Sequence, residues 1–119
     1  MGKNKDQKDC LFCKISRGEI PSKLVYSDER LFVCEDIAKR APFHFLIIPR
    51  NHIATINDLS LDDIELIGEV VLTAKKIAIQ FKFAESGYRL VINCNKDGGQ
   101  EIFHIHWHLL AGKSLSCIG

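Results

Sequence analysis

The chain has 119 residues, enough for one compact domain and too few for two ordinary ones. Hydrophobic residues make up 46% and charged residues 26% of the sequence, with 8 Gly and only 3 Pro, which excludes collagenous, disordered and low-complexity proteins. The 16 Lys and Arg nearly balance the 15 Asp and Glu, so the net charge is +1. Because this charge gives no basic field to hold nucleic acid, we expect any phosphate-bearing ligand to be small and bound locally.

The N-terminal sequence and the cysteine count indicate an intracellular protein. The first residues, MGKNKDQKD, are polar where a signal peptide is apolar, and no apolar run approaches the ~20 residues that span a bilayer. We therefore expect no membrane partner and a cytoplasmic location, with the nucleus left open as a second one. An odd number of cysteines in such a chain favours thiols over a disulfide framework. They are Cys10, Cys13, Cys34, Cys94 and Cys117.

The first half of the chain predicts a short helix and three strands. Residues 1–9 are charged and polar and are expected to form a disordered tail, followed by a single domain over 10–119. Leu11 to Arg17 suits a short helix that ends at Gly18, whose missing Cβ favours a left-handed cap. Three β-rich runs over 23–26, 31–35 and 43–48 then predict an antiparallel meander.

A long helix follows these strands. Ser60 and Asp63 nearly match a capping box and predict its start. Its apolar face is predicted from spacings of three and four residues, at Ile64, Ile67, Val71, Ala74, Ala78 and Phe81. Leu66, Val70 and Ile77 widen the apolar arc beyond the usual ~100°. One sheet does not need so much apolar surface, which favours a partner subunit.

Two further strands are expected over 88–93 and around 104–110, on either side of a loop that contains Gly98 and Gly99. The full order is short helix, three strands, long helix and two strands. This order predicts an α+β domain with an antiparallel sheet.

Three of the five histidines lie in one segment, HIHWHLL, at positions 104, 106 and 108. If the segment is a strand, their side chains share one face while Ile105, Trp107 and Leu109 fill the core behind. Same-face neighbours on a strand are roughly 6.5 to 7 Å apart, so the three imidazoles can surround one small anionic group. The plainest alternative is three incidental polar residues on a solvated strand.

Two kinds of chemistry fit this row of imidazoles. A His-x-His pair on a strand can supply two ligands to a catalytic zinc ion that keeps an open water position. Alternatively, one histidine is itself the nucleophile and its neighbours tune it and the leaving group. Gly98 and Gly99 upstream would let backbone N–H groups approach a phosphate closely, although paired glycines also form ordinary turns.

The order of strands, the segment APFHFLIIPRNH at 41–52 and the run from Asn93 through GGQ at 98–100 to HIHWHLL resemble the histidine triad (HIT) superfamily. The likeness is to its nucleotide-binding branch, also labelled protein kinase C interacting proteins, and covers roughly residues 10–112. It implies a HIT-like fold in which the five-stranded sheets of a homodimer join into one ten-stranded sheet. It also implies hydrolysis of purine nucleoside phosphoramidates, such as adenosine 5′-monophosphoramidate, with release of AMP.

The resemblance assigns a role to each histidine of the signature. His106 would attack the α-phosphorus and form a nucleotidyl-histidine that water then resolves, and no cofactor is required for this chemistry. His108 would contact the phosphate and help the leaving amine take a proton, while His104 and His44 would orient and polarise the row. The nucleotide-binding residues implied in the same way are Ile20, Asp36, Ile37, Asn93, Gly99, Gln100, Glu101, His106 and His108.

Two departures from the family pattern limit what is transferred. Glu101 stands where many relatives have Ser after Gly-Gly-Gln, as in some bacterial members, so a hydroxyl role in leaving-group protonation does not carry over. The end of the chain also lacks the Trp-Pro-Pro-Gly tail of the animal proteins. Three other functions stay open beside the phosphoramidase: a dinucleoside polyphosphate hydrolase, a zinc-dependent hydrolase built on His104 and His106, and a non-catalytic protein that binds AMP or GMP.

A second site is indicated by Cys10 and Cys13, which have the spacing of zinc ligands. The same spacing also suits two buried thiols on a helix, or a redox pair, although a redox pair is typical of a βαβ context that this sequence does not predict. In metal-bearing relatives the pair is completed by residues that correspond to His52 and His104. The resemblance thus implies a structural zinc site in which His104 is a brace more than a proton carrier.

Overall fold

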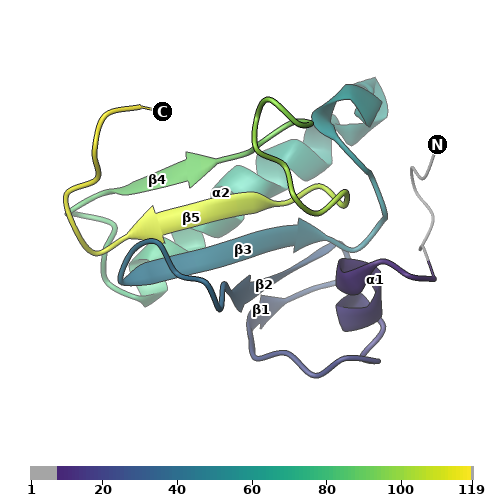
Figure 1. Cartoon of the computed structure of the whole chain (residues 1–119). Coiled ribbons are helices and arrows are strands. Elements are labelled where there is room, and N and C mark those ends of the chain that lie inside the picture. Colours follow the sequence, from purple (N-terminus) through teal and green to yellow (C-terminus); the bar gives the residue numbers. More distant parts are fainter. Residues whose placement is uncertain (1–7, 119) are drawn as a thin grey trace.

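Five antiparallel strands form one sheet in the order β1-β2-β3-β5-β4 (Figure 1). The structure is a computed structural model that describes residues 8–118, so most of the predicted tail, residues 1–7, and Gly119 lie outside the described residues. The strands are β1 Leu24–Ser27, β2 Leu31–Glu35, β3 Phe43–Pro49, β4 Tyr88–Val91 and β5 Trp107–Ala111. The helices are α1 Leu11–Ser16 and α2 Ile64–Gln80, with 3₁₀ turns at Ile56–Asp58 and Leu61–Asp63. The predicted α+β fold is confirmed.

The two faces of the sheet carry two separate apolar clusters because strand side chains alternate. In β2, Leu31 and Val33 face the main core under α2, whereas Phe32 and Cys34 face the opposite side. Strand β3 continues the same alternation, so Leu46 and Ile48 join Phe32 and Cys34 there. The short helix α1 covers only part of this second face, through Phe12, which leaves room for a cavity beside it.

Helix α1 is short because both of its ends are defined locally. Cys10 is the N-cap, and its Sγ accepts the backbone N–H of Cys13 at 3.5 Å. The helix ends before Gly18, which has a φ of +79°, in agreement with the left-handed cap predicted for it. Cys10, Phe12 and Cys13 are thereby held on one short turn against the sheet.

Helix α2 begins as predicted, but the prediction of its buried face is only partly right. The backbone N–H of Ser60 donates to Asp63 Oδ2 at 2.9 Å, as in a capping box, and a 3₁₀ turn leads into the helix. The side chains packed on the sheet are those of Leu66, Val70, Thr73, Ala74, Ile77 and Ala78. Ala74 and Ala78 of the predicted apolar face are therefore buried, whereas Ile64 and Val71, placed on the same face from their spacing, are 60% and 52% exposed. Since apolar residues surround most of the helix, spacing alone does not decide which stripe is buried.

Strand β5 is shorter than expected, and this corrects the prediction of one histidine-bearing strand. Pairing with β3 begins at Trp107 opposite Ile47. Residues 104–106 precede the strand, where the N–H of Ile105 donates to the carbonyl of Ile53, in the segment after β3, at 2.6 Å. His104 therefore does not follow the strand alternation that His108 obeys.

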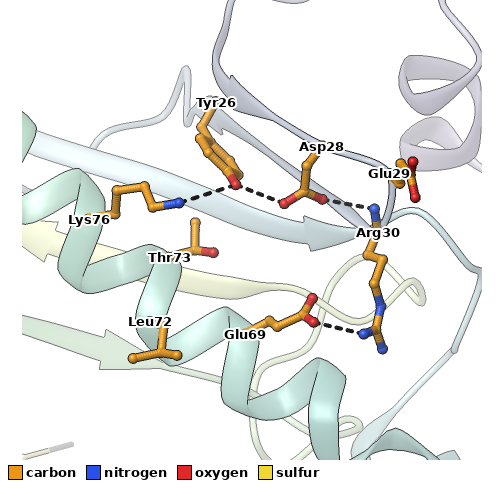
Figure 2. A pocket seen from close by; sticks show the side chains of 8 residues that line it. All are labelled: Tyr26, Asp28, Glu29, Arg30, Glu69, Leu72, Thr73 and Lys76. Atoms are coloured by element: carbon orange, nitrogen blue, oxygen red, sulfur yellow. Dashed lines mark hydrogen bonds and ion pairs between the residues drawn. The ribbon is translucent and has the colours of Figure 1, made fainter.

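A hollow of about 520 Å³ lies where the β1–β2 turn meets α2 (Figure 2). Its charged side chains contact one another, because Arg30 pairs with Glu69 at 2.7 Å and Tyr26 donates to Asp28 at 2.8 Å. Lys76 lies over the Tyr26 ring, 4.8 Å from its centroid. These mutual contacts fasten the turn to the helix. Within residues 8–118, no helix has the length and apolarity needed to cross a membrane.

Candidate active site

A cavity of about 720 Å³ opens on the α1 side of the sheet and collects most of the predicted functional residues. Its walls come from α1, the segments after β2 and β4, the loop before β5, and β5 itself. Figure 1 shows that α1 and the loop between β4 and β5 lie at the same end of the sheet. The predicted residues that line it are Ile20, Asp36, Ile37, His44, Asn93, Gly99, Glu101, His106 and His108.

His44 and His108 form a hydrogen-bonded pair whose proton positions follow from its neighbours. The backbone N–H of Arg40 donates to His44 Nδ1 at 3.1 Å, so in the neutral ring the proton is on Nε2. This Nε2 lies 2.9 Å from His108 Nδ1, which must then accept. The proton of neutral His108 is consequently on its Nε2, so this ring of the cavity wall carries an N–H donor.

His106 has the opposite tautomer. Its Nδ1 lies 2.8 Å from the backbone carbonyl oxygen of His104, which can only accept, so Nδ1 carries the proton. Its Nε2 therefore keeps a lone pair. The ring centroids of His106 and His108 are 5.0 Å apart, so a ring with an unprotonated nitrogen neighbours a ring with an N–H donor.

All three cavity imidazoles are biased towards the neutral form. Burial lowers the pKa of His44 and the pKa of His106 below their ordinary values, because desolvation penalises the charged ring. The pKa of His108 falls to about 4, first through burial and then through repulsion from charge on His106 and His44. A neutral imidazole retains the lone pair that a nucleophile needs.

Asp36 stands at the end of β2 and closes a turn while facing the cavity. Its Oδ1 accepts the N–H of Ala38 at 2.9 Å, and its Oδ2 lies 3.3 Å from His44 Nε2. The predicted ribose contact and the plainer role of a turn residue are thus compatible. Ile37, beside it, is 100% exposed at the cavity, so its side chain is available to a ligand.

Gln100 was predicted to bind nucleotide, but the structure places it behind the cavity wall. It is buried, and its amide donates to the carbonyls of Ala54 at 2.8 Å and Ile102 at 3.1 Å. Its Oε1 accepts the N–H of Asn95 at 2.9 Å. With all of these bonds made inside the protein, Gln100 holds the loop and does not line the cavity.

His104 also lies outside the cavity lining, in a cluster with the two thiols and His52. The prediction that all three imidazoles of the row face one ligand is therefore wrong for this residue. His104 Nε2 lies 2.7 Å from the carbonyl oxygen of Pro49 and must donate to it, so Nδ1 keeps its lone pair. Nδ1 lies 3.3 Å from Cys10 Sγ and 3.6 Å from Cys13 Sγ.

The residues Cys10, Cys13, His52 and His104 fit a closed zinc site. One ligand atom from each of the four lies within 4.8 Å of all the others, and Cys13 Sγ is 3.5 Å from His52 Nδ1. Two thiolates and two imidazoles are a common donor set for structural zinc. The bond from His104 to Pro49 supplies the outer contact that orients a ligating imidazole.

Asp36, His44 and His108 also come within ligating distance of one another, but their geometry differs. The lone pair of His108 Nδ1 is directed at the N–H of His44, and the two nitrogens share one proton. Because these two nitrogens bond to each other, the hydrogen bond accounts for their proximity without a metal ion.

Sequence reasoning missed several cavity residues. Phe12 lies between the two cysteines and places its ring edge-on against His106, with centroids 5.1 Å apart. Leu46 lies on the same face of β3 as His44, so strand alternation alone could have found it. Arg40 also lines the cavity, and its backbone N–H sets the tautomer of His44, but no pattern in the nearby sequence predicts either role.

Residues 17–115 match the family described as HIT domain. The purine nucleoside phosphoramidase of Escherichia coli strain K12 is 48% identical over 107 residues, which cover 90% of each chain. An uncharacterized HIT-like protein of Buchnera aphidicola is 43% identical over 91% of this chain and 96% of its own length.

Two solved structures share the fold over nearly the whole chain. A HIT family hydrolase from Legionella pneumophila has a TM-score of 0.89 and 51% identity, over 91% of this chain and 96% of that one. A histidine triad protein from Clostridium difficile has a TM-score of 0.91 and 39% identity, over 95% and 98% of the two chains. The similarity therefore extends well beyond the histidine segment.

Proposed function

Because this chain belongs to the HIT family, we propose that it is a purine nucleoside phosphoramidase, which hydrolyses the P–N bond of nucleoside 5′-phosphoramidates and releases AMP or GMP. One observation carries the proposal: an unprotonated Nε2 on His106 lies beside an N–H donor on His108 in a single cavity. A nucleophile with an acid next to it is what displacement of an amine from phosphorus requires.

In the first step His106 replaces the amine. A bond forms between Nε2 of His106 and phosphorus, and the P–N bond to the amine breaks. The electron pair stays on the departing nitrogen, which must take a proton as the bond breaks. We propose that the anionic phosphate of the bound substrate favours one additional proton on the hydrogen-bonded pair of His44 and His108, so that His108 reacts as an imidazolium. It gives the proton on Nε2 to the amine and is left neutral, while the phosphorylated ring of His106 carries the positive charge.

In the second step water resolves the nucleotidyl-histidine. The water oxygen bonds to phosphorus, the bond from phosphorus to Nε2 of His106 breaks, and the water proton returns to Nε2 of His108. The carbonyl of His104 keeps the His106 ring in one orientation throughout, through the bond to Nδ1. Dividing one hard displacement into two easier ones is the advantage of a covalent intermediate.

The nucleoside is proposed to lie on the side of the cavity formed by the segments after α1 and β2. A carboxylate can accept hydrogen bonds from two ribose hydroxyls, and Asp36 has one oxygen beyond its turn contact. Ile20 and Ile37 supply apolar surface for a base, and Asn93 and Gly99 line the wall nearer β4. Gly99 has a φ of +85°, which allows its backbone to approach a phosphate closely.

The decisive experiment replaces His106 with Asn or Ala and measures amine release from adenosine 5′-monophosphoramidate. We expect activity to fall by at least about a thousandfold, because no other ring presents a free lone pair here. A diadenosine polyphosphate assayed in parallel distinguishes the rival hydrolase, which would cleave it faster. AMP binding without turnover in the wild-type protein would instead support a non-catalytic nucleotide-binding protein.

We also propose that Cys10, Cys13, His52 and His104 hold a structural zinc ion. When bound, the ion would join the start of α1 to the segment before β5, and it would take no part in proton transfer. The cluster lies outside the cavity lining, apart from the two rings proposed to react. A zinc-dependent hydrolase built on His104 and His106 would need both imidazoles on one ion, whereas His104 is directed at the thiols.

We further propose a homodimer that functions in the cytoplasm. Ile64, Val71, Leu72 and Ile79 leave an exposed apolar stripe on α2, each more than half exposed. Strand β4 is an edge strand next to β5 and is free to pair with a second copy. Joining the two β4 edges would extend the sheet to ten strands and cover the stripes. Cell fractionation of the tagged chain tests the location.

A further inference from the structure

The loop between β4 and β5 presents Glu101 to the cavity from a rigid base. Gly98 is packed so closely that an added Cβ would lie 2.6 Å from the carbonyl oxygen of Cys94. The next anchor is the buried side chain of Gln100, held by three hydrogen bonds. On the other side Ile102 packs against the apolar cluster that contains Phe12. Between these two anchors Glu101 is solvent-exposed and lines the cavity.

Acidic side chains outnumber basic side chains on the cavity wall. Glu35, Asp36 and Glu101 carry carboxylates, and Arg40 is the only Lys or Arg among the lining residues. Lys39 neutralises Glu35 at 2.8 Å, and Asp36 is engaged with His44 and the turn after β2. In the described part of the chain, no ion pair or hydrogen bond engages the carboxylate of Glu101.

We infer that Glu101 selects the leaving group by its charge, favouring amines that carry a second, cationic group and rejecting anionic ones. The inference rests on the proposed phosphoramidase function and specifies its substrate class. Asp36, Ile20 and Ile37 occupy the side assigned to the nucleoside, whereas Glu101 is on the loop at the β4–β5 side, five residues before His106. We therefore place the departing amine on the Glu101 side of the cavity, away from the residues assigned to the nucleoside.

The same carboxylate should disfavour a dinucleoside polyphosphate relative to a phosphoramidate. The leaving group of the dinucleoside polyphosphate is itself a nucleotide with several negative charges, which the carboxylate repels. An amine with an ammonium group on a short chain is attracted instead. For an exposed pair, each interaction changes the rate by about fivefold, so the two together separate cationic from anionic leaving groups by more than about tenfold.

The test uses three adenosine 5′-phosphoramidates of equal chain length, whose amine ends in an ammonium, a hydroxyl or a carboxylate. We expect kcat/KM to decrease in that order for the wild-type enzyme. Glu101→Gln should bring the three values together, and Glu101→Lys should invert the order. Asp97→Asn is the matched control, because it removes an exposed carboxylate from the same loop at a position that does not line the cavity. It should keep the wild-type order.

Salt provides a second measurement that needs no variant. Raising the ionic strength to about 1 M shortens the screening length to ~3 Å and should reduce the wild-type ratio of cationic to anionic substrate towards one. Equal rates for all three compounds at low salt, or an unchanged ratio in Glu101→Gln, would overturn the role of Glu101 alone. Failure to cleave even the hydroxyl compound would overturn the phosphoramidase function itself.

Discussion

The backbone carbonyl of His104 accepts the Nδ1 proton of His106 at 2.8 Å, while the side chain of His104 belongs to the thiol cluster. One residue thus contributes to two sites with different parts of its structure. Its carbonyl sets the tautomer of the proposed nucleophile, and its imidazole holds the segment before β5 against α1.

Loss of metal should destabilise the protein more than it impairs catalysis. We expect about one zinc per chain by elemental analysis, and a lower melting temperature after treatment with a strong chelator, because the cluster joins α1 to the segment before β5. Phosphoramidase activity should decrease by no more than about tenfold, since the cluster does not line the cavity. Complete loss of activity that zinc restores would instead support the zinc-dependent hydrolase.

Stability should fall as the pH is lowered from about 6.5 to about 4. His108 has a pKa of about 4 in the folded chain, and an unfolded histidine titrates near 6.5. Between these values the unfolded state binds more protons, so the free energy of unfolding decreases with falling pH; below about pH 4 this residue causes no further loss. Urea unfolding at pH 7 and pH 5 measures the decrease. His108→Gln should show a smaller one, and an equal decrease in both proteins would contradict the assignment.

Gln100 should contribute through stability rather than through contact with substrate. Replacing it with Ala removes three hydrogen bonds and leaves partly buried backbone groups of Ala54, Asn95 and Ile102 without these partners, which costs about 2 kcal/mol. Chemical denaturation gives this difference, with Gln80→Ala at an exposed position of α2 as the control. If the variant has wild-type stability and only its KM is raised, the result would support the predicted contact between Gln100 and the nucleotide.

Disrupting the exposed stripe of α2 should convert the proposed dimer to a monomer. Val71 is 52% exposed, so Val71→Asp places a charge in the interface without burying it in the core of one subunit. Light scattering at micromolar concentration should report the mass of one chain, with an unchanged circular dichroism spectrum. Gln80→Asp changes the charge of the same helix away from the stripe and should leave the dimer intact. A wild-type protein that is already monomeric would contradict the proposal.

Much of the fold could be predicted because its signals are local. The alternation in β2 and β3 sorts their side chains between two faces, and Gly18 and Ser60 mark helix boundaries with groups close in sequence. The buried stripe of α2 could not be chosen, because Val70 and Val71 have equal hydrophobicity and only the position of the sheet distinguishes them.

In the candidate site, too, local signals were predictive and long-range contacts were not. The histidine signature located His106 and His108 correctly at the cavity, but strand alternation put His104 there too. Its true position depends on the bond from Ile105 to Ile53, which joins segments about fifty residues apart. The position of the Gln100 side chain behind the cavity wall could not be predicted for a similar reason, since its partner Ala54 is equally remote in sequence.

The double attachment of His104 also offers a practical handle on the enzyme. Cobalt(II) has visible absorption bands and could be exchanged into the thiol cluster. It would then be bound by the imidazole of His104, whose backbone carbonyl holds the ring of His106. Its spectrum would then record strain that reaches the cluster when a nucleotide is attached to His106 and when it leaves. The colour of the protein could be followed during turnover without any dye or labelled substrate.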